Sequence, residues 1–179
     1  VDDGTIDVTN IDESSLSGGM VNGQLAGFTT GSNTIAVFYN TEIFDQAGVA
    51  YPSDDWTWSE FLSTAKEIYD ATGIQTEIPF LSEARWAVEA MVRSMGYDFF
   101  SEDGTSLPWA EDEAVVTAVA NTIQSIYEGV QEGYLVDPEV QVAWSATEDY
   151  YISQGNAAMS LNLSNYYTVY SQALGQELG

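Results

Sequence analysis

Apolar positions in this chain recur at a helical period in several long segments, separated by short apolar runs. The helical segments are predicted at 58–72, 83–95, 112–131, 147–154 and 164–173, with a shorter helix from Thr41 that Gly48 ends. The short runs predict strands at 24–28, 34–39, 78–81, 99–100 and 157–161. Short strands that alternate with longer helices predict an α/β fold, in which a short central sheet is flanked by helices.

Three local sequence signals predict the positions of a turn, a strand and a helix start. Asn22-Gly23 predicts a tight hairpin turn. The run 34–39 is apolar on both faces, which predicts a buried central strand. Thr57 and Glu60 have the spacing of a capping box, with Trp56 and Phe61 at the positions of a hydrophobic staple. We therefore expect a well-defined helix to begin at residue 58.

The charge of the chain narrows its possible partners. Asp and Glu total 28 against 3 Lys and Arg, for a net charge of -25. A surface this acidic repels phosphates and anionic lipids, so we expect neither a nucleic-acid partner nor membrane insertion of this segment. Self-repulsion also predicts a melting temperature that rises with salt. The chain has no Cys and no His, which excludes thiolate and imidazole metal sites and a Ser-His-Asp triad within it.

Three motifs occur in an order that resembles a known family. They are 22–28 with 38–48, the helix start at 52–61, and the strand at 155–162. Together they resemble the family 1 extracellular solute-binding proteins of ABC importers, the relatives of maltodextrin-binding proteins. The resemblance covers about Asn22 to Leu174, and the ordered set is more specific than any one motif.

The resemblance implies a periplasmic-binding-protein-like lobe of type II. Residues 1–30 would form the edge of a first lobe with its hinge-crossing strand, and 31–179 a second lobe that lacks its C-terminal helices. The implied function is capture of a mono- or oligosaccharide and delivery to the permease subunits of an ABC importer, without catalysis, cofactor or metal. The implied location is extracellular, in the periplasm or at the cell surface through a lipid anchor. A fragment of this kind would expose an apolar patch where its partners are missing, or dimerise through it.

The resemblance also implies ligand-binding residues, and each has a structural alternative. Side chains with donors, acceptors or flat apolar faces suit a sugar, but the same side chains also bond the backbone, stabilise helix dipoles or fill cores. Arg85 would pair a uronate or a nearby carboxylate. For Tyr166, with Tyr167 beside it, the alternative is the core of the last helix. The candidates are Ser32, Asn33, Glu83, Arg85, Trp86, Trp144, Asn162, Asn165 and Tyr166.

Two other classes of function stay open from the sequence alone. One is a glycoside hydrolase, which needs two carboxylates facing each other across a cleft. In a chain this acidic, such pairs arise easily by chance. The other is a surface interaction protein that reuses the lobe without transport.

Overall fold

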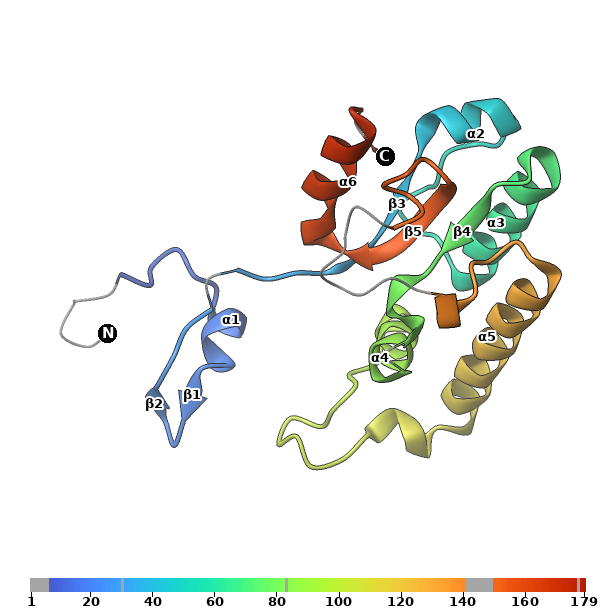
Figure 1. The fold of residues 1–179 in the computed structure, drawn as a ribbon. Helices are drawn as coiled ribbons and strands as arrows, with labels where there is room; N and C mark the ends of the chain where they lie inside the picture. Colours follow the sequence, from blue (N-terminus) through green and yellow to red (C-terminus); the bar gives the residue numbers. More distant parts are fainter. Residues whose placement is uncertain (1–6, 30, 83, 141–149, 177) are drawn as a thin grey trace. The chain divides into compact units, whose positions relative to one another are not determined.

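The computed structural model describes residues 7–29, 31–82, 84–140, 150–176 and 178–179, which form two compact units, Val1–Thr34 and Ile35–Gly179. The first unit contains helix α1 (Glu13–Ser17) and the antiparallel strands β1 (Met20–Val21) and β2 (Gln24–Leu25) (Figure 1). Asn22 and Gly23 both have positive φ, 51° and 77°, as a type I′ turn requires. The predicted hairpin is confirmed, but its second strand ends at Leu25, three residues earlier than expected.

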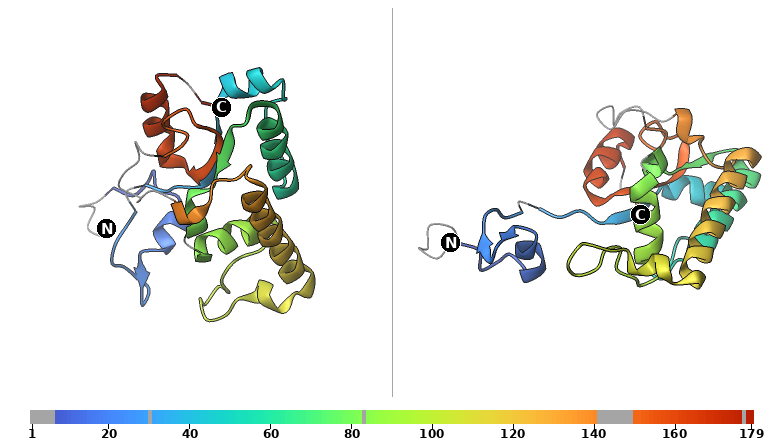
Figure 2. Two further views of the ribbon diagram at one scale, coloured as in Figure 1. Left: turned by 45° about the vertical axis from the view of Figure 1, so that its right-hand side comes forward. Right: turned by 90° about the horizontal axis from the view of Figure 1, so that it is seen from below.

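The second unit has a three-stranded sheet with helices on both faces (Figures 1 and 2). Its strands are β3 (Ile35–Tyr39), β4 (Gln75–Glu77) and β5 (Ala157–Leu163). Its α-helices are α2 (Thr41–Ala47), α3 (Trp58–Thr72), α4 (Ala84–Ser94), α5 (Glu113–Glu132) and α6 (Tyr167–Leu174). Short 3₁₀ helices are η1 (Pro79–Ser82), η2 (Pro108–Glu111), η3 (Pro138–Val140) and η5 (Ser164–Tyr166). None of the described helices is long and apolar enough to span a membrane.

The strand order is β3-β5-β4, so β5 lies in the centre of the sheet. β3 pairs with β5 in antiparallel fashion, and β4 pairs with β5 in parallel. The prediction that 34–39 forms a central strand is wrong, because β3 lies at an edge of this sheet. Its apolar side chains are needed on both faces nevertheless, since Val37 packs into one core and Phe38 into another. The apolar residues on both faces of this strand therefore indicated that both faces are buried. A strand at the edge of a sheet can be buried on both faces as well.

Two other predicted strands are absent. The strand expected at 78–81 is η1 from Pro79 onward, and β4 forms instead at the more polar run Gln75–Glu77. Residues 99–100 are bends that lead into a turn at Gly104. Of the helix expected at 147–154, residues 147–149 lie outside the described residues, residue 150 is in a bend, and 151–155 form turns. In each case a short apolar run did not distinguish a strand or helix from a packed turn.

The helix boundaries agree best with the sequence where capping residues are present. Thr57 Oγ1 accepts from the Glu60 N–H at 3.2 Å, and the Glu60 carboxylate accepts from the Thr57 N–H at 2.9 Å, which confirms the capping box. The rings of Trp56 and Phe61 lie 6.1 Å apart, as a hydrophobic staple requires. Asn40 and Asp112 cap α2 and α5 in the same manner. These contacts are local in sequence, and for that reason they could be predicted.

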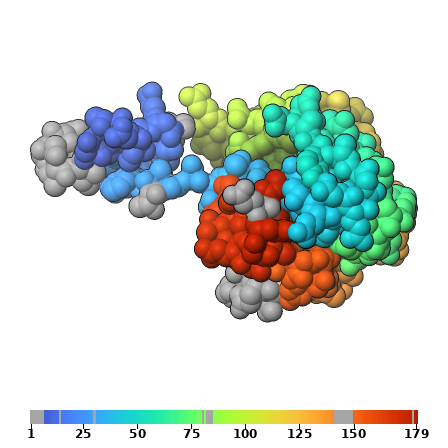
Figure 3. Space-filling view, turned by 90° about the horizontal axis from the view of Figure 1, so that it is seen from above, coloured from blue at the N-terminus to red at the C-terminus, as the bar shows by residue number. Residues whose placement is uncertain are grey.

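Each face of the sheet has its own core. The first core lies between the sheet and helices α2, α3, α4 and α5, and its fully buried members include Phe44, Ile68, Met91 and Met159. The second core lies between the other face and α6, whose red surface adjoins the orange segment before β5 in Figure 3. Its buried members are Phe38, Tyr150, Ile152, Ala157, Tyr166, Tyr170 and Leu178.

Candidate functional site

One edge of the sheet collects most of the candidate residues that the structure describes in the second unit. β4 and β5 are parallel, so their carboxyl ends meet at the same edge, and the antiparallel strand β3 begins there, because Ile35 pairs with Leu163. Ligands of open α/β sheets bind outside the carboxyl ends of the strands. η1 and α4 follow β4 at this edge, and η5 follows β5. We refer to it as the carboxyl edge.

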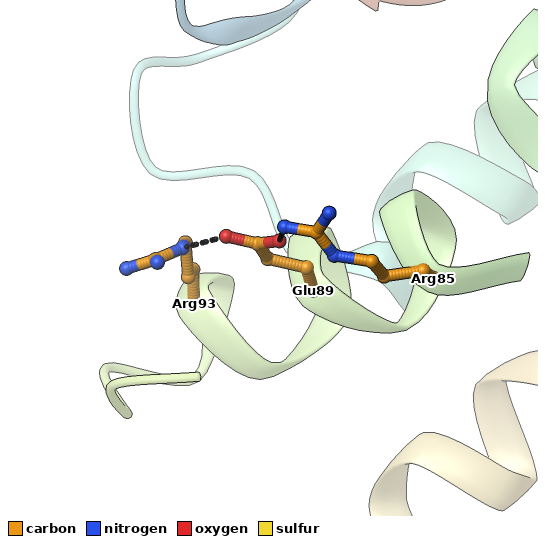
Figure 4. Close-up of polar contacts among 3 residues, drawn as sticks. All are labelled: Arg85, Glu89 and Arg93. Carbon is orange, nitrogen blue, oxygen red and sulfur yellow. Dashed lines mark hydrogen bonds and ion pairs between the residues drawn. The ribbon is translucent and has the colours of Figure 1, made fainter. Parts of the chain in front are cut away.

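Arg85 and Trp86 lie in the first turn of α4, just beyond the carboxyl end of β4. The Trp86 side chain is 41% exposed, which leaves a flat apolar surface open to solvent. The Arg85 guanidinium carbon lies 5.4 Å from the centre of the Trp86 ring, within cation–π range. Arg85 Nη2 also pairs with Glu89 Oε2 at 3.3 Å, and Arg93 Nε pairs with Glu89 Oε1 at 2.9 Å (Figure 4). Of the two roles open to Arg85, the structure therefore shows the pairing with a neighbouring carboxylate.

Beyond β5, the structure separates the two tyrosines that follow Asn165. Tyr166 is only 8% exposed, and its ring stacks on Tyr170 with centroids 5.6 Å apart. The Tyr166 ring therefore packs in the second core, the structural alternative expected for it, and its assignment as a ligand-binding residue stays a prediction. Tyr167, the first residue of α6, is exposed instead, and so is Asn165. These two residues present the ring and the amide that a sugar could use.

Asn162 is also buried, and its side chain makes hydrogen bonds within the protein. It is 0% exposed, its Nδ2 donates to the Tyr170 hydroxyl at 2.6 Å, and its Oδ1 accepts from the Leu163 N–H at 2.8 Å. The structure therefore places the Asn162 side chain inside the protein, and its assignment to the ligand-binding set stays a prediction. Asn162 holds the end of β5 against α6, directly before the exposed residues of the carboxyl edge.

The same face buries a carboxyl group that the sequence analysis did not single out. Glu77 is 3% exposed at the end of β4 and accepts from the N–H groups of Tyr151 at 3.0 Å and Ile152 at 3.3 Å. Burial raises the pKa of Glu77 to about 7, although hydrogen bonds from Ser160 and from these two N–H groups oppose the shift. Glu77 therefore joins β4 to the segment before β5.

The remaining candidates lie elsewhere. Ser32 and Asn33 belong to the first unit, where both are exposed. Glu83 and Trp144 lie outside the described residues. Within the part of the chain that the structure describes, no group of three or more acidic side chains is arranged to hold a metal ion.

Phe100 is an exposed aromatic residue that the sequence analysis did not consider for the site, and Tyr167 is one that it named only beside Tyr166. The Phe100 ring lies 5.7 Å from the Arg85 guanidinium carbon. The sequence predicted a strand at 99–100. Nothing in that prediction placed Phe100 beside α4. Tyr167 could have been distinguished from Tyr166 by helical spacing, because Tyr166, in η5, and Tyr170, in α6, are four residues apart and are both buried.

Comparison with known proteins identifies the family of this chain. The family model described as bacterial extracellular solute-binding protein matches residues 2–179. The arabinooligosaccharide-binding protein of Halalkalibacterium halodurans is 32% identical over 83 residues, which are 46% of this chain and 18% of that protein. The chain therefore spans only part of the length of this relative.

Solved structures show the same fold. An ABC substrate-binding protein from Listeria monocytogenes in complex with cycloalternan matches 96% of this chain and 42% of its own, with a TM-score of 0.71 and 21% identity. The cyclic α-maltosyl-1,6-maltose binding protein of Arthrobacter globiformis matches the same shares, with a TM-score of 0.64 and 18% identity. The mixed α/β architecture, with short sheets flanked by helices, is thus a periplasmic-binding-protein-like fold, as the sequence predicted. The chain spans less than half the length of these proteins.

Proposed function

The chain belongs to the family of bacterial extracellular solute-binding proteins, and on this premise we propose that it captures an oligosaccharide for an ABC importer. The observation that carries the proposal is the exposed ring of Trp86 at the carboxyl edge of the sheet. A flat ring packs against the apolar C–H face of a sugar, and polar groups beside it orient the hydroxyls. Arg85 supplies donors next to the ring, and Asn165 supplies both a donor and an acceptor beyond the neighbouring strand.

Binding in this proposal is reversible and involves no chemistry on the sugar. Ligand shifts the protein toward its ligand-binding conformation by its higher affinity for that conformation. A glycoside hydrolase would need two carboxyl groups facing the glycosidic bond. Within the described part of α4, the carboxylate of Glu89 is already engaged by two arginines, Arg85 and Arg93. This arrangement supports binding over hydrolysis at the carboxyl edge.

The partners and location follow from the same proposal. The captured sugar passes to the permease subunits of the importer, and the protein acts outside the cytoplasmic membrane, in the periplasm or anchored at the cell surface. The net charge of -25 agrees with a neutral ligand better than with an anionic one, because long-range repulsion slows the approach of anions.

The test is a thermal-shift panel on the protein as its organism makes it. Arabino-, malto- and manno-oligosaccharides are compared with a peptide and a polyamine. We expect at least one sugar series to raise the melting temperature with a logarithmic dependence on concentration, as for any ligand that binds only the folded state. A shift with the peptide or polyamine and none with any sugar would overturn the proposal. Release of new reducing ends from the bound sugar would favour the hydrolase.

The Trp86→Ala variant locates the site. We expect its affinity for the sugar to fall about tenfold or more, which corresponds to about 1.4 kcal/mol. Tyr127→Ala removes an exposed ring on α5, away from the carboxyl edge, and serves as the matched control. Equal affinity in wild type and Trp86→Ala, measured by calorimetry, would remove Trp86 from the site.

A further inference from the structure

The turn between β1 and β2 consists of an asparagine followed by a glycine (Figure 1). Asn22 and Gly23 are both exposed, and both have positive φ. A Cβ built on Gly23 would meet no atom within 4 Å, so the space around the peptide bond between the two residues is open. Every other asparagine of the chain is followed by a residue that carries a side chain. The nitrogen of Gly23 is therefore the backbone nitrogen after an asparagine that is least hindered by its own residue.

This pair is suited to an intramolecular reaction of the asparagine side chain. The Gly23 backbone nitrogen attacks the Asn22 side-chain carbonyl carbon and forms a C–N bond. The bond from that carbon to the side-chain nitrogen breaks, and ammonia leaves with the proton of the Gly23 N–H, so that a cyclic imide remains. Water then opens the imide at one of its two carbonyl carbons and gives aspartate or isoaspartate. A glycine favours the first step, because it lacks a Cβ and reaches backbone conformations that other residues rarely adopt.

The hairpin is small enough to release the turn for this reaction. β1 and β2 pair over two residues each, Met20 with Leu25 and Val21 with Gln24. A two-stranded hairpin is marginally stable in water, and segments with few buried contacts open locally at a low cost in free energy. Both residues of β1 are exposed, so little apolar burial opposes the opening. Asn22 can therefore reach the conformation for cyclisation while the rest of the chain stays folded.

Asp103-Gly104 is a second exposed turn with a related pair of residues, and hydrogen bonds hold its carboxyl group. Asp103 Oδ1 accepts from Ser101 Oγ at 2.6 Å, from the Thr105 N–H at 3.1 Å and from Thr105 Oγ1 at 2.8 Å. The hydrogen bond from Ser101, followed by those from Thr105, lowers the pKa of Asp103, so this carboxyl is ionised at neutral pH. A carboxylate resists attack by a nitrogen, whereas the amide of Asn22 carries no charge. Within the part of the chain that the structure describes, no such set of hydrogen bonds holds the Asn22 side chain.

We propose that Asn22 is a site of spontaneous deamidation, at which the chain supplies the attacking nitrogen and water supplies the entering oxygen. Isoaspartate places one additional atom in the backbone of the two-residue turn. Because a turn of this length fixes the register of the strands that it joins, the isoaspartyl product loses the pairing of β1 with β2. Aspartate keeps the pairing, since Asp-Gly also forms type I′ turns. Both products add one negative charge to a net charge of -25.

The test follows each asparagine in the folded protein as its organism makes it. The protein is incubated between pH 6 and pH 9 and digested in acid, and fragmentation mass spectrometry separates asparagine, aspartate and isoaspartate at each position. Asn10, which is exposed in the same unit and is followed by Ile11, is the matched control. We expect Asn22 to convert about tenfold faster than Asn10 or more, which corresponds to a barrier lower by about 1.4 kcal/mol. The rate at Asn22 should rise with pH, because base removes the proton of the attacking nitrogen.

Two variants separate the reaction from its structural consequence. Asn22→Gly removes the amide and keeps a pair that forms type I′ turns, so it should show no conversion at this turn. Asn22→Asp carries the charge of the products without the additional backbone atom. Its hydrogen exchange in β1 and β2 should match that of fresh wild type, while the purified isoaspartyl form should exchange faster there.

Two results would overturn the inference. Equal rates at Asn22 and Asn10, or no conversion at Asn22 over the whole pH range, would remove the deamidation site. Equal hydrogen exchange in β1 and β2 of the fresh and the isoaspartyl protein would remove the proposed loss of strand pairing.

Discussion

The two faces of the central sheet are packed by different chemistry. The first core consists of aliphatic and aromatic side chains from four α-helices and the sheet, such as Phe44 and Met159. The second core is built around tyrosines and also buries Glu77, Ser160 and Asn162. Apolar side chains stabilise the fold without requiring particular partners, whereas buried polar groups stabilise it only when they are hydrogen-bonded. The stability of the first core should therefore depend on the volume of its side chains. The stability of the second core should depend on protonation and on individual hydrogen bonds.

Phe44→Ala tests the first face and should have the largest effect. Phe44 is fully buried, and its ring lies 5.0 Å from that of Tyr39. Truncation of a buried phenylalanine leaves a cavity and costs about 3–5 kcal/mol of the free energy of unfolding. Urea denaturation should show a lower midpoint with an unchanged slope. Tyr127→Ala, at an exposed aromatic position, is the control, and an equal loss in both variants would contradict the assignment of the core.

Glu77 tests the second face through pH. Its pKa is raised from 4.5 to about 7 in the folded protein, so folding favours the protonated carboxyl. Its contribution to the free energy of unfolding is fully present below pH 4.5, is lost as the pH rises through 7, and changes little above that. At about 1.4 kcal/mol per pKa unit, the loss is about 3 kcal/mol.

The Glu77→Gln variant isolates this effect from the other carboxylates. Glutamine cannot ionise and keeps one acceptor for the N–H groups of Tyr151 and Ile152. Urea denaturation at pH 4 and pH 8 should show that the stability of the variant relative to wild type rises by about 3 kcal/mol between the two. The same difference in stability between variant and wild type at both pH values would mean that folding does not raise the pKa of Glu77.

Tyr170→Phe removes one hydroxyl from the second core without changing its volume. The Asn162 side chain donates to this hydroxyl at 2.6 Å, and Ser160 Oγ lies 3.4 Å from it. Leaving a buried donor without its partner costs about 1–3 kcal/mol. Tyr167→Phe makes the same chemical change at the exposed start of α6 and should cost less than about 0.5 kcal/mol. Equal thermal midpoints for the two variants would show that the buried hydroxyl contributes no stability.

Thr57→Ala should have the smallest of these effects, about 1 kcal/mol. It removes the acceptor for the Glu60 N–H at the start of α3, on the side of the first core. Ser59→Ala, in the same exposed turn, leaves the cap intact and is the matched control. A loss of 3 kcal/mol or more in Thr57→Ala would place Thr57 in the core rather than at a cap.

The candidate site was only partly predictable from the sequence. Arg85, Trp86 and Asn165 were identified through the family resemblance, and the structure places them beyond β4 and β5. Asn162 and Tyr166 were assigned to the same set but are buried. A motif fixes the position of a residue along the chain, while the direction of its side chain depends on which face of β5 or α6 is covered. The pairing of Arg85 with Glu89 was open to sequence reasoning, since the residues are one helical turn apart.

The sequence by itself determined the interactions between residues that are close along the chain. The turn at Asn22-Gly23, the capping box of Thr57 and Glu60, and the α/β alternation depend on residues close in sequence, so their pattern was sufficient. Tertiary structure alone decided that β3 lies at an edge, that Glu77 meets the N–H groups of residues more than seventy positions away, and that Phe100 lies against Arg85. These contacts join segments that are distant along the chain. Hydrophobic period and residue type do not specify which segments meet, because many pairings bury the same apolar surface.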